Sequence, residues 1–315
     1  MKNFFKEEIQ KGLSSCELLT LIYIAFTTVL IGVFWQEMDN AATLLETRAA
    51  VLGTMVVLYA LHCWKPCRAL WLVRSIWLLL ALSFWYPETY QFARQLPYLD
   101  HVFANADWTL FGCQPSIVFS RVVPSVFWCE AFNMGYYSYY FMMFGVMLFV
   151  FLRRFEQSER YAFIFLGSFF LYYVIFELMP VAGPYYYFKF IGLEAAESGH
   201  YPPVGHYFAT HGELIHVEVK GIFSQLVHDI QVAGENPVGA FPSSHVGMGT
   251  VTMLIAWHTR NRWLFWCLMP LYVLLCIATV YIMAHYLVDT LSGLLSACLF
   301  YVLMDWIYTK CFQRR

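Results

Sequence analysis

The sequence predicts an all-α, polytopic membrane protein, a helical bundle of about eight transmembrane helices with a long extracytoplasmic loop before the sixth. Of its 315 residues, 60% are hydrophobic and only 13% are charged, whereas a soluble domain carries roughly a quarter charged residues. Several uncharged runs approach the roughly 20 residues that a transmembrane helix needs. The net charge of -2 gives no reason to expect a nucleic-acid partner. The chain is therefore expected to be integral to a lipid bilayer.

Eight apolar stretches can be read as spans. They cover approximately residues 18–36, 49–64, 69–86, 132–152, 161–179, 244–259, 264–283 and 286–308. The first stretch is long for a signal peptide and is followed by a poor cleavage site, so it is interpreted as a span.

The basic residues between the spans indicate the orientation. Thirteen lie on one side of the predicted membrane: Lys2, Lys6, Lys11, Lys65, Arg68, Arg153, Arg154, Arg160, Arg260, Arg262, Lys310, Arg314 and Arg315. Five lie on the other side: Arg48, Arg94, Arg121, Lys189 and Lys220. Because basic loops are retained in the cytoplasm, both termini are predicted to be cytoplasmic.

Two regions are distinguished along the chain. Residues 1–130 are predicted to hold the N-terminal transmembrane helices and an extracytoplasmic interfacial segment, which runs from Pro87 to Pro124 and contains turn residues and one tryptophan, Trp108. Residues 131–315 are predicted to form a transmembrane catalytic core. The tyrosines at 136–140 are interpreted as an interfacial aromatic belt, with hydroxyls that line a polar pocket as the alternative.

The segment from about 181 to 241 contains no span and is longer than a connection needs, so it is read as a lid or a binding element. Residues 214–232 follow the pattern of an amphipathic helix lying on the membrane. Its histidines are His200, His206, His211, His216 and His228. The spacing of His206, His211 and His216 does not align them on one helix face. No metal or other cofactor is therefore expected, and activity should survive chelators.

The nine cysteines show no paired metal-ligand spacing. Cys113 and Cys129 fall in a predicted extracytoplasmic segment, where an oxidising compartment permits a disulfide. The sequence leaves open whether these two residues pair.

The candidate catalytic residues are His245, His285 and Asp289. Each histidine stands at the head of an apolar stretch, and Arg260 and Arg262 mark the other end of the hairpin between them. Both imidazoles are then expected at the same, extracytoplasmic, membrane face. Since Asp289 follows His285 by one helical turn, its carboxylate is predicted to accept from Nδ1–H and to leave Nε2 free to attack phosphorus. His245 is placed to protonate the leaving alcohol.

The candidate phosphate- or substrate-binding residues lie near this group and near the end of the fifth span. Pro242 suits the first turn of a helix, whose free N–H groups and serine hydroxyls form a natural phosphate cradle. Glu177 is an ionisable residue at the end of a span, either functional or solvated at the interface. The candidates are Ser243, Ser244, Lys189, Tyr185 and Glu177.

These residues carry a resemblance to a known family. Pro242-Ser243-Ser244-His245 and His285-Tyr286-Leu287-Val288-Asp289 resemble the second and third motifs of the type 2 phosphatidic acid phosphatase superfamily, over roughly residues 130 to 305. The H-Y-x-x-D wording is similar to the branch that contains the inositol phosphorylceramide and sphingomyelin synthases. The resemblance implies that His285 is the nucleophile, Asp289 its orienting partner and His245 the general acid.

Two departures from the family pattern bear on the substrate. Thr279 stands where the third motif usually carries an arginine, and the first motif, K-x-x-x-x-x-x-R-P, is absent. Other basic residues, among Lys189, Arg121 and Lys220, are then expected to neutralise the phosphate. The missing arginines favour the synthase branch over a standard phosphatase.

The sequence thus predicts an integral-membrane lipid phosphotransferase or lipid phosphate phosphatase that works through a phosphohistidine on the periplasmic or lumenal side. Its expected partners are a membrane lipid substrate (phospholipid, sphingolipid or lipid phosphate) and the bilayer. The alternative is a non-catalytic lipid-binding or transport protein that keeps the fold. The lipid, the acceptor and the oligomeric state are not determined by the sequence.

Overall fold

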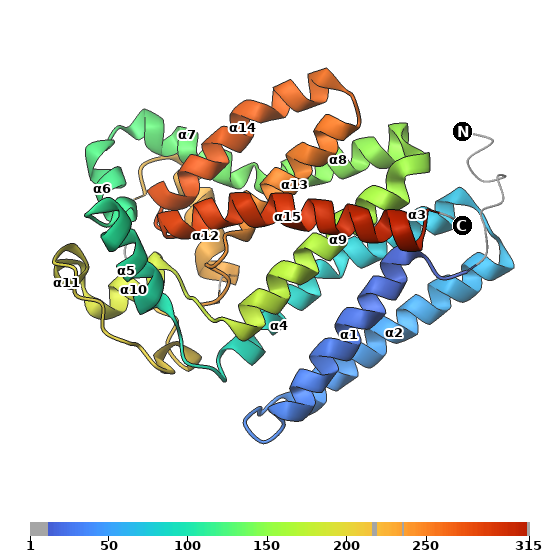
Figure 1. The fold of residues 1–315 in the computed structure, drawn as a ribbon, viewed down its shortest axis with the longest axis horizontal. Coiled ribbons are helices and arrows are strands. Elements are labelled where there is room, and N and C mark those ends of the chain that lie inside the picture. The colour runs from blue at the N-terminus through green and yellow to red at the C-terminus, as the bar shows by residue number, and fades with distance from the viewer. Residues whose placement is uncertain (1–11, 216–218, 235, 314–315) are drawn as a thin grey trace.

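The structure, a computed structural model, describes residues 12–215, 219–234 and 236–313. Across these residues every regular element is a helix, so the predicted all-α class is confirmed (Figure 1). His216 and the basic residues Lys2, Lys6, Lys11, Arg314 and Arg315 lie outside the described residues.

The N-terminal helices are α1 (Ser15–Val33), α2 (Ala41–Trp64), α3 (Arg68–Leu80) and α4 (Leu82–Ala93). Because α3 and α4 follow each other almost without a break, they form a single candidate span. Buried ion pairs connect this group: Arg48 of α2 contacts Glu88 of α4 at 2.6 Å, and Arg74 of α3 contacts Glu17 of α1. Charges buried in pairs of this kind fix which helices are neighbours.

The predicted interfacial segment contains α5 (Asp100–Phe111) and α6 (Pro115–Val122). The fourth predicted span is broken into α7 (Val126–Tyr137) and α8 (Tyr139–Arg153), which are bent by 41°. It leads into α9 (Phe155–Leu178), the most enclosed of the long helices. α9 is apolar around most of its circumference because it packs against α1, α4, α8, α13 and α15.

The long segment contains α10 (Pro184–Ile191), α11 (Leu193–Glu197), a short 3₁₀ helix (Tyr207–Ala209) and α12 (Ile222–Gly234). α12 corresponds to the predicted amphipathic helix but begins eight residues later than the predicted start at 214. It packs against α7.

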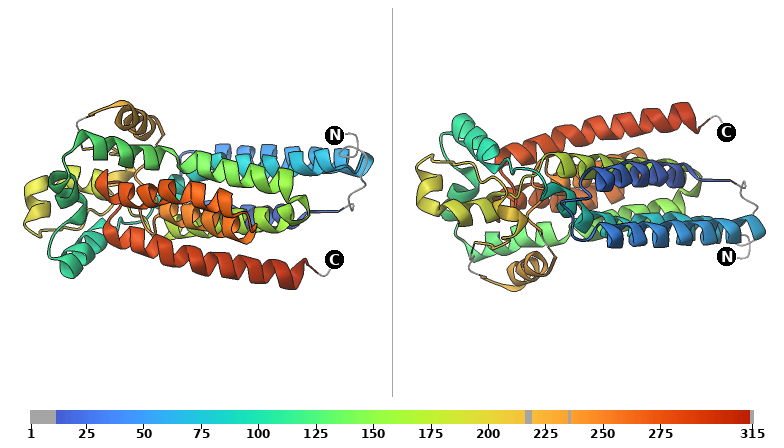
Figure 2. Two further views of the ribbon diagram at one scale, coloured as in Figure 1. Left: turned by 90° about the horizontal axis from the view of Figure 1, so that it is seen from above. Right: turned by 90° about the horizontal axis from the view of Figure 1, so that it is seen from below.

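The predicted hairpin is formed by α13 (Ser244–His258) and α14 (Arg262–Tyr281), and α15 (Leu287–Cys311) returns beside them. The long helices run along the longest axis of the molecule (Figure 2). α5, α6, α10, α11 and α12 gather at one end, whereas α1 begins and α15 ends at the other. The starts of α13 and α15 therefore lie at the end where the connecting segment is folded.

Among the residues that the structure describes, six helices are long and apolar enough to cross a membrane, and the bent pair α7–α8 gives up to seven. α13 has only 15 residues, or about 22 Å, which is shorter than the roughly 30 Å hydrocarbon layer. The membrane-bundle class is thus supported, while the number of eight spans remains a prediction.

Candidate active site

His285 lies in the turn between α14 and α15, and its side chain is buried. Its Nδ1 is 2.7 Å from the backbone carbonyl oxygen of Ala240. Because a carbonyl oxygen only accepts, Nδ1 carries the proton and Nε2 keeps its lone pair. Burial lowers the pKa of His285 from 6.5 to about 4, although the bond to Ala240 opposes this shift. The imidazole is therefore neutral near pH 7, which is the form that a nucleophile requires.

His245 occupies the first turn of α13 and faces His285. Its Nδ1 is 3.4 Å from Nε2 of His285, and the two ring centroids are 5.6 Å apart. Tyr136 stacks on the His245 ring at 4.6 Å, and Tyr139 lies at 4.8 Å on α8. The structure thus brings together the two candidate histidines, which are 40 positions apart in the sequence. Tyr136 and Tyr139 therefore pack their rings against the candidate site.

Asp289 does not make the contact predicted for it. One of its carboxylate oxygens accepts from the backbone N–H of Tyr286 at 3.0 Å, and its other oxygen has no partner within the described part of the chain. The prediction that Asp289 accepts from Nδ1 of His285 is wrong for this structure, because the Ala240 carbonyl holds that position. Asp289 instead caps the start of α15, and its own backbone oxygen accepts from the N–H of Ser243.

Two carboxylates of α5 hold the chain around His285, and the sequence analysis missed both. Asp107 accepts from the backbone N–H groups of Leu287 and Val288, at the start of α15, at 2.8 and 2.9 Å. Asp100, two turns away on the same helix face, accepts from the N–H groups of Ala182 and Gly183 at 2.9 and 2.7 Å. Burial raises the pKa of Asp107 to about 6 and that of Asp100 to about 7.

Asp100 also accepts from the hydroxyl of Tyr286, the residue after His285. Gly183 lies so close to this turn that an added Cβ would be 2.9 Å from the carbonyl oxygen of Ala284. The two acidic residues of α5, seven apart and so on one face of the helix, were the sequence signal for this arrangement.

Ser243 and Ser244 begin α13 and are both buried. The Ser243 hydroxyl accepts from the backbone N–H of Val246 at 3.3 Å, so it caps the helix. The backbone oxygen of Ser244 accepts from the Tyr139 hydroxyl. The predicted helix start beside the histidines is therefore present, with the Ser243 hydroxyl already engaged in the cap.

A comparison with protein families decides the affiliation of the chain. The sequence model described as the PAP2 superfamily matches residues 100–303. The chain belongs to the PAP2 superfamily. No curated protein and no solved structure matches it significantly. Members of this superfamily are phosphatases and phosphotransferases, and membership fits an enzyme that acts on lipid substrates in the bilayer. The match begins about 30 residues before the resemblance noted in the sequence, and so includes the α5 carboxylates.

The remaining binding candidates of this PAP2 protein do not all lie near the histidines. Glu177 is buried on α9 and accepts from the hydroxyl of Tyr23 of α1 at 2.7 Å, so it faces the N-terminal helices. Lys189 is exposed near the end of α10. Arg121 is paired with Glu197. Lys220 is therefore the one of the three predicted phosphate-neutralising residues that is neither exposed nor in an ion pair among the described residues.

Lys220 lines a cavity of about 180 Å³ between α7, α12 and the end of α14. Tyr185 and Met283, two residues before His285, line the same cavity. So does Gln231 of α12, which is buried and whose side-chain nitrogen finds no partner within the described part of the chain. A half-buried cation and an unpaired amide donor suit an anionic, hydrogen-bonding group.

A second cavity, open and almost entirely apolar, has a volume of about 690 Å³. It lies between α6, α7 and α14 and reaches Leu287 at the start of α15. Val280 lines this cavity, whereas the next residue, Tyr281, lines the polar one. The polar and apolar cavities therefore lie on either side of the last turn of α14, which leads directly to His285.

Within the part of the chain that the structure describes, no group of three or more His, Cys, Asp or Glu side chains is arranged to hold a metal ion. Cys113 and Cys129 are free thiols.

Proposed function

We propose that this PAP2 protein transfers or hydrolyses the phosphate group of a membrane lipid through a phosphohistidine on His285. The observation that carries the proposal is the fixed tautomer of that residue. The Ala240 carbonyl oxygen accepts a hydrogen bond from Nδ1–H at 2.7 Å, so Nδ1 keeps its proton and the lone pair of Nε2 faces His245. A neutral, oriented imidazole beside a second imidazole is suited to nucleophilic catalysis with general acid assistance.

In the first step, His245 has taken up a proton with the bound phosphate and is an imidazolium. Nε2 of His285 attacks phosphorus, the bond between phosphorus and the alcohol oxygen breaks, and His245 gives the leaving oxygen its Nδ1 proton and becomes neutral. In the second step, His245 takes a proton from the acceptor, whose oxygen attacks the phosphohistidine and restores His285. The 3.4 Å between the two ring nitrogens leaves no space for a phosphate. His245 therefore turns away from His285 when the substrate binds, which frees its Nδ1–H for the leaving group.

The two cavities beside the last turn of α14 support a lipid substrate. The polar one, with Lys220 and Gln231, suits the phosphate and headgroup. The apolar one suits an acyl chain that enters from the bilayer. Lys220 then supplies the positive charge that the missing arginines of the family motifs do not.

Asp289 is proposed as a positioning residue. It acts through the start of α15, where it caps the backbone beside His285. Ser243 and Ser244 are proposed to contribute through the α13 start that carries His245.

The synthase branch, with an alcohol such as inositol or diacylglycerol as acceptor, is the finer proposal. It is supported by the H-Y-x-x-D motif at residues 285–289 and by the presence of Thr279 in place of the arginine that is usual in the third family motif. The Thr279 hydroxyl is buried 3.0 Å from that of Thr290, and its carbonyl accepts from the N–H of His285. This position therefore serves the packing of α14 on α15. We also propose that the site faces the extracytoplasmic side.

The test compares His285→Ala with His245→Ala on two substrates, in purified protein. With a lipid phosphate that has a poor alkoxide leaving group, both variants should lose activity, His245→Ala by about 10²–10⁴-fold. With a p-nitrophenyl ester, His245→Ala should keep much of its first step and accumulate phosphate on His285. His285→Ala should form no phosphoenzyme with either substrate.

A panel of lipid phosphates, with and without inositol or diacylglycerol, identifies the acceptor by the mass of the products. A phosphoenzyme in His285→Ala would refute the assignment of the nucleophile. Binding of lipids without any turnover by the unmodified protein would instead favour the non-catalytic alternative.

A further inference from the structure

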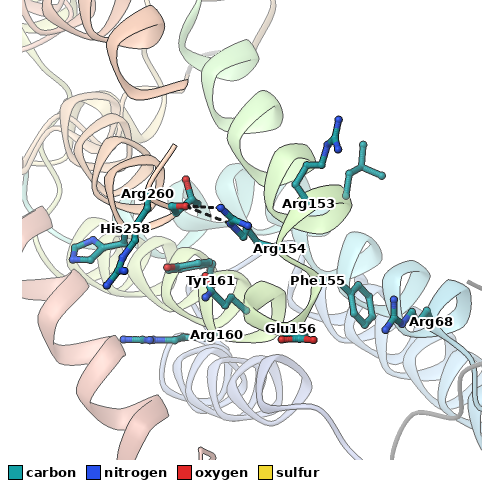
Figure 3. A pocket seen from close by; sticks show the side chains of 12 residues that line it. Arg68, Arg153, Arg154, Phe155, Glu156, Arg160, Tyr161, His258 and Arg260 are labelled. Carbon is teal, nitrogen blue, oxygen red and sulfur yellow. Dashed lines mark hydrogen bonds between the residues drawn. The ribbon is translucent and has the colours of Figure 1, made fainter. Parts of the chain in front are cut away.

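A basic cavity lies at the end of the molecule away from the histidines. α13 begins beside His245 and ends at His258, so the turn after it is one helix length, about 22 Å, from the candidate active site. This turn, the junction of α8 and α9 and the start of α3 enclose a cavity of about 740 Å³ (Figure 3). Five arginines line it: Arg68, Arg153, Arg154, Arg160 and Arg260.

The positive charge of this cavity is only partly offset. Arg160 is paired with Asp305 of α15 at 2.6 Å. Glu156 is the one acidic side chain among the described residues that line the cavity. Arg260 is exposed and forms no ion pair within the described part of the chain. Several like charges held in one concave surface attract anions, because each lowers the energy of the same bound charge.

Separate parts of the chain hold these arginines in place. Arg154 donates to the backbone oxygen of Thr259 at 3.2 Å, which ties the α8–α9 junction to the α13–α14 turn. Arg68 lies over the ring of Phe155 at 4.7 Å. Arg260 takes a left-handed backbone conformation with φ of 58°, which glycine usually occupies after a helix. The first turn of α9 also starts here and has no side-chain cap.

We propose that this cavity binds a phosphate-bearing anion at the membrane surface opposite the candidate active site. Guanidinium groups bind phosphate by paired, charge-assisted hydrogen bonds, and the fixed arginines from separate helices provide several such donors. The phosphate belongs either to the headgroup of an anionic lipid or to a soluble molecule. The exposed side chain of Leu152 at the rim allows lipid chains to lie beside the cavity. The site is independent of the proposed catalysis.

The experiment titrates the detergent-solubilised full chain with dioctanoyl phosphatidylglycerol and counts the bound lipids by native mass spectrometry. Dioctanoyl phosphatidylcholine is the uncharged comparison, and inorganic phosphate is titrated separately by its effect on thermal unfolding. Arg260→Gln is compared with Arg262→Gln. Both residues are exposed, both substitutions remove one positive charge, and Arg262 begins α14 only two positions after Arg260, but of the two only Arg260 lines the cavity.

Arg260→Gln should weaken binding of the anionic lipid about 5- to 30-fold, while Arg262→Gln leaves it unchanged. The same contrast seen only with inorganic phosphate would support the site and assign it to a soluble anion. Equal weakening by both variants would overturn the proposal, because it would show attraction by surface charge alone. If neither the anionic lipid nor inorganic phosphate binds, the proposal is overturned as well. Both exposed variants should unfold at the temperature of the unmodified chain, which confirms that they fold.

Discussion

At the scale of the residue, a backbone carbonyl controls the protonation of the candidate nucleophile. The Ala240 oxygen accepts from Nδ1 of His285, so the tautomer depends on the path of the chain rather than on another side chain. A carbonyl cannot be protonated in the range where proteins are stable, and it therefore fixes one tautomer at every working pH. The reactive nitrogen faces His245 as a consequence.

The pH profile follows from the burial of His285. Since its pKa is lowered from 6.5 to about 4, the neutral form persists down to about pH 4. We expect kcat/KM to lose this group's contribution only as the pH falls through about 4. The free energy of unfolding should also decrease as the pH falls from about 6.5 to about 4, because over this range the unfolded chain binds the proton more readily than the folded one. Rates and unfolding temperatures measured from pH 4 to 9 check this, and an inactivation of His285 centred near 6.5 would contradict it.

Replacing Asp289 by asparagine separates two roles of this residue. Asparagine keeps an oxygen that can accept from the N–H of Tyr286, so the start of α15 should be preserved. We expect kcat to fall less than about tenfold and the unfolding temperature to stay close to that of the unmodified protein. A loss of about 10⁴-fold, as occurs when a catalytic histidine loses its orienting carboxylate, would show that Asp289 contacts His285 during turnover. Asp289→Ala, which removes the cap, is the comparison for stability.

Lys220 is expected to bind the phosphate of the substrate. Lys220→Gln should lower kcat/KM by about 10- to 100-fold, because a hydrogen bond to a charged group contributes about 1.5–3 kcal/mol. Lys189→Gln removes the same charge from an exposed position on α10 and should leave kcat/KM nearly unchanged. Steady-state kinetics on a lipid phosphate measure both. Equal effects of the two substitutions would point to general attraction of the substrate by surface charge.

At the scale of the element, α5 organises the turn that holds His285. Its two carboxylates accept four backbone N–H bonds, two from the 182–183 turn and two from the start of α15. The N–H groups of Leu287 and Val288, in the first turn of α15, have no partners within that helix, and those of Ala182 and Gly183 lie in the turn before α10, so each pair needs an acceptor from elsewhere. A short helix outside the apolar spans thereby fixes the start of a transmembrane helix.

The crossing of α13 and α15 depends on Gly293. A Cβ at this position would be 2.4 Å from the backbone oxygen of Ser243, which the chain can relieve only by moving α13. We expect Gly293→Ala to lower the free energy of unfolding by about 1–3 kcal/mol. It should also reduce kcat/KM, because His245 moves with α13.

Gly145→Ala in α8 is the matched control. Its Cβ would meet no atom within 4 Å, so stability should stay the same or rise slightly. Thermal unfolding in detergent and the rate with a lipid phosphate check both variants. A Gly293→Ala protein with normal rate and stability would show that the two helices are not so closely packed.

At the scale of the whole molecule, the basic residues and the helix order predict the orientation. Both termini are expected in the cytoplasm, with the histidines on the opposite side. Variants that retain a single cysteine test this, because Cys113 lies between α5 and α6 near the histidine end and Cys311 ends α15. A membrane-impermeant maleimide applied to intact cells should label Cys113 and spare Cys311. Labelling of Cys311 alone would contradict the prediction and show the opposite orientation.

The sequence by itself determined the all-α membrane class, the hairpin of α13 and α14, and the placement of His245 and His285 at one end. Apolar length and local motifs carry this information, because a long apolar run forms a helix wherever it lies. The short span 244–259 was predicted and corresponds to α13 (Ser244–His258). The break between α7 and α8 was not predicted.

Only the tertiary structure decided the partners of these residues. Asp107 bonds to a residue 180 positions away, and the carbonyl that holds His285 lies 45 positions before it. Such contacts depend on how helices pack, which residue spacing does not encode. The H-x-x-x-D spacing placed Asp289 near His285 on the helix, but the turn at His285 directs its Nδ1 to Ala240. Spacing specifies which side chains share a helix face, and packing decides which of them meet.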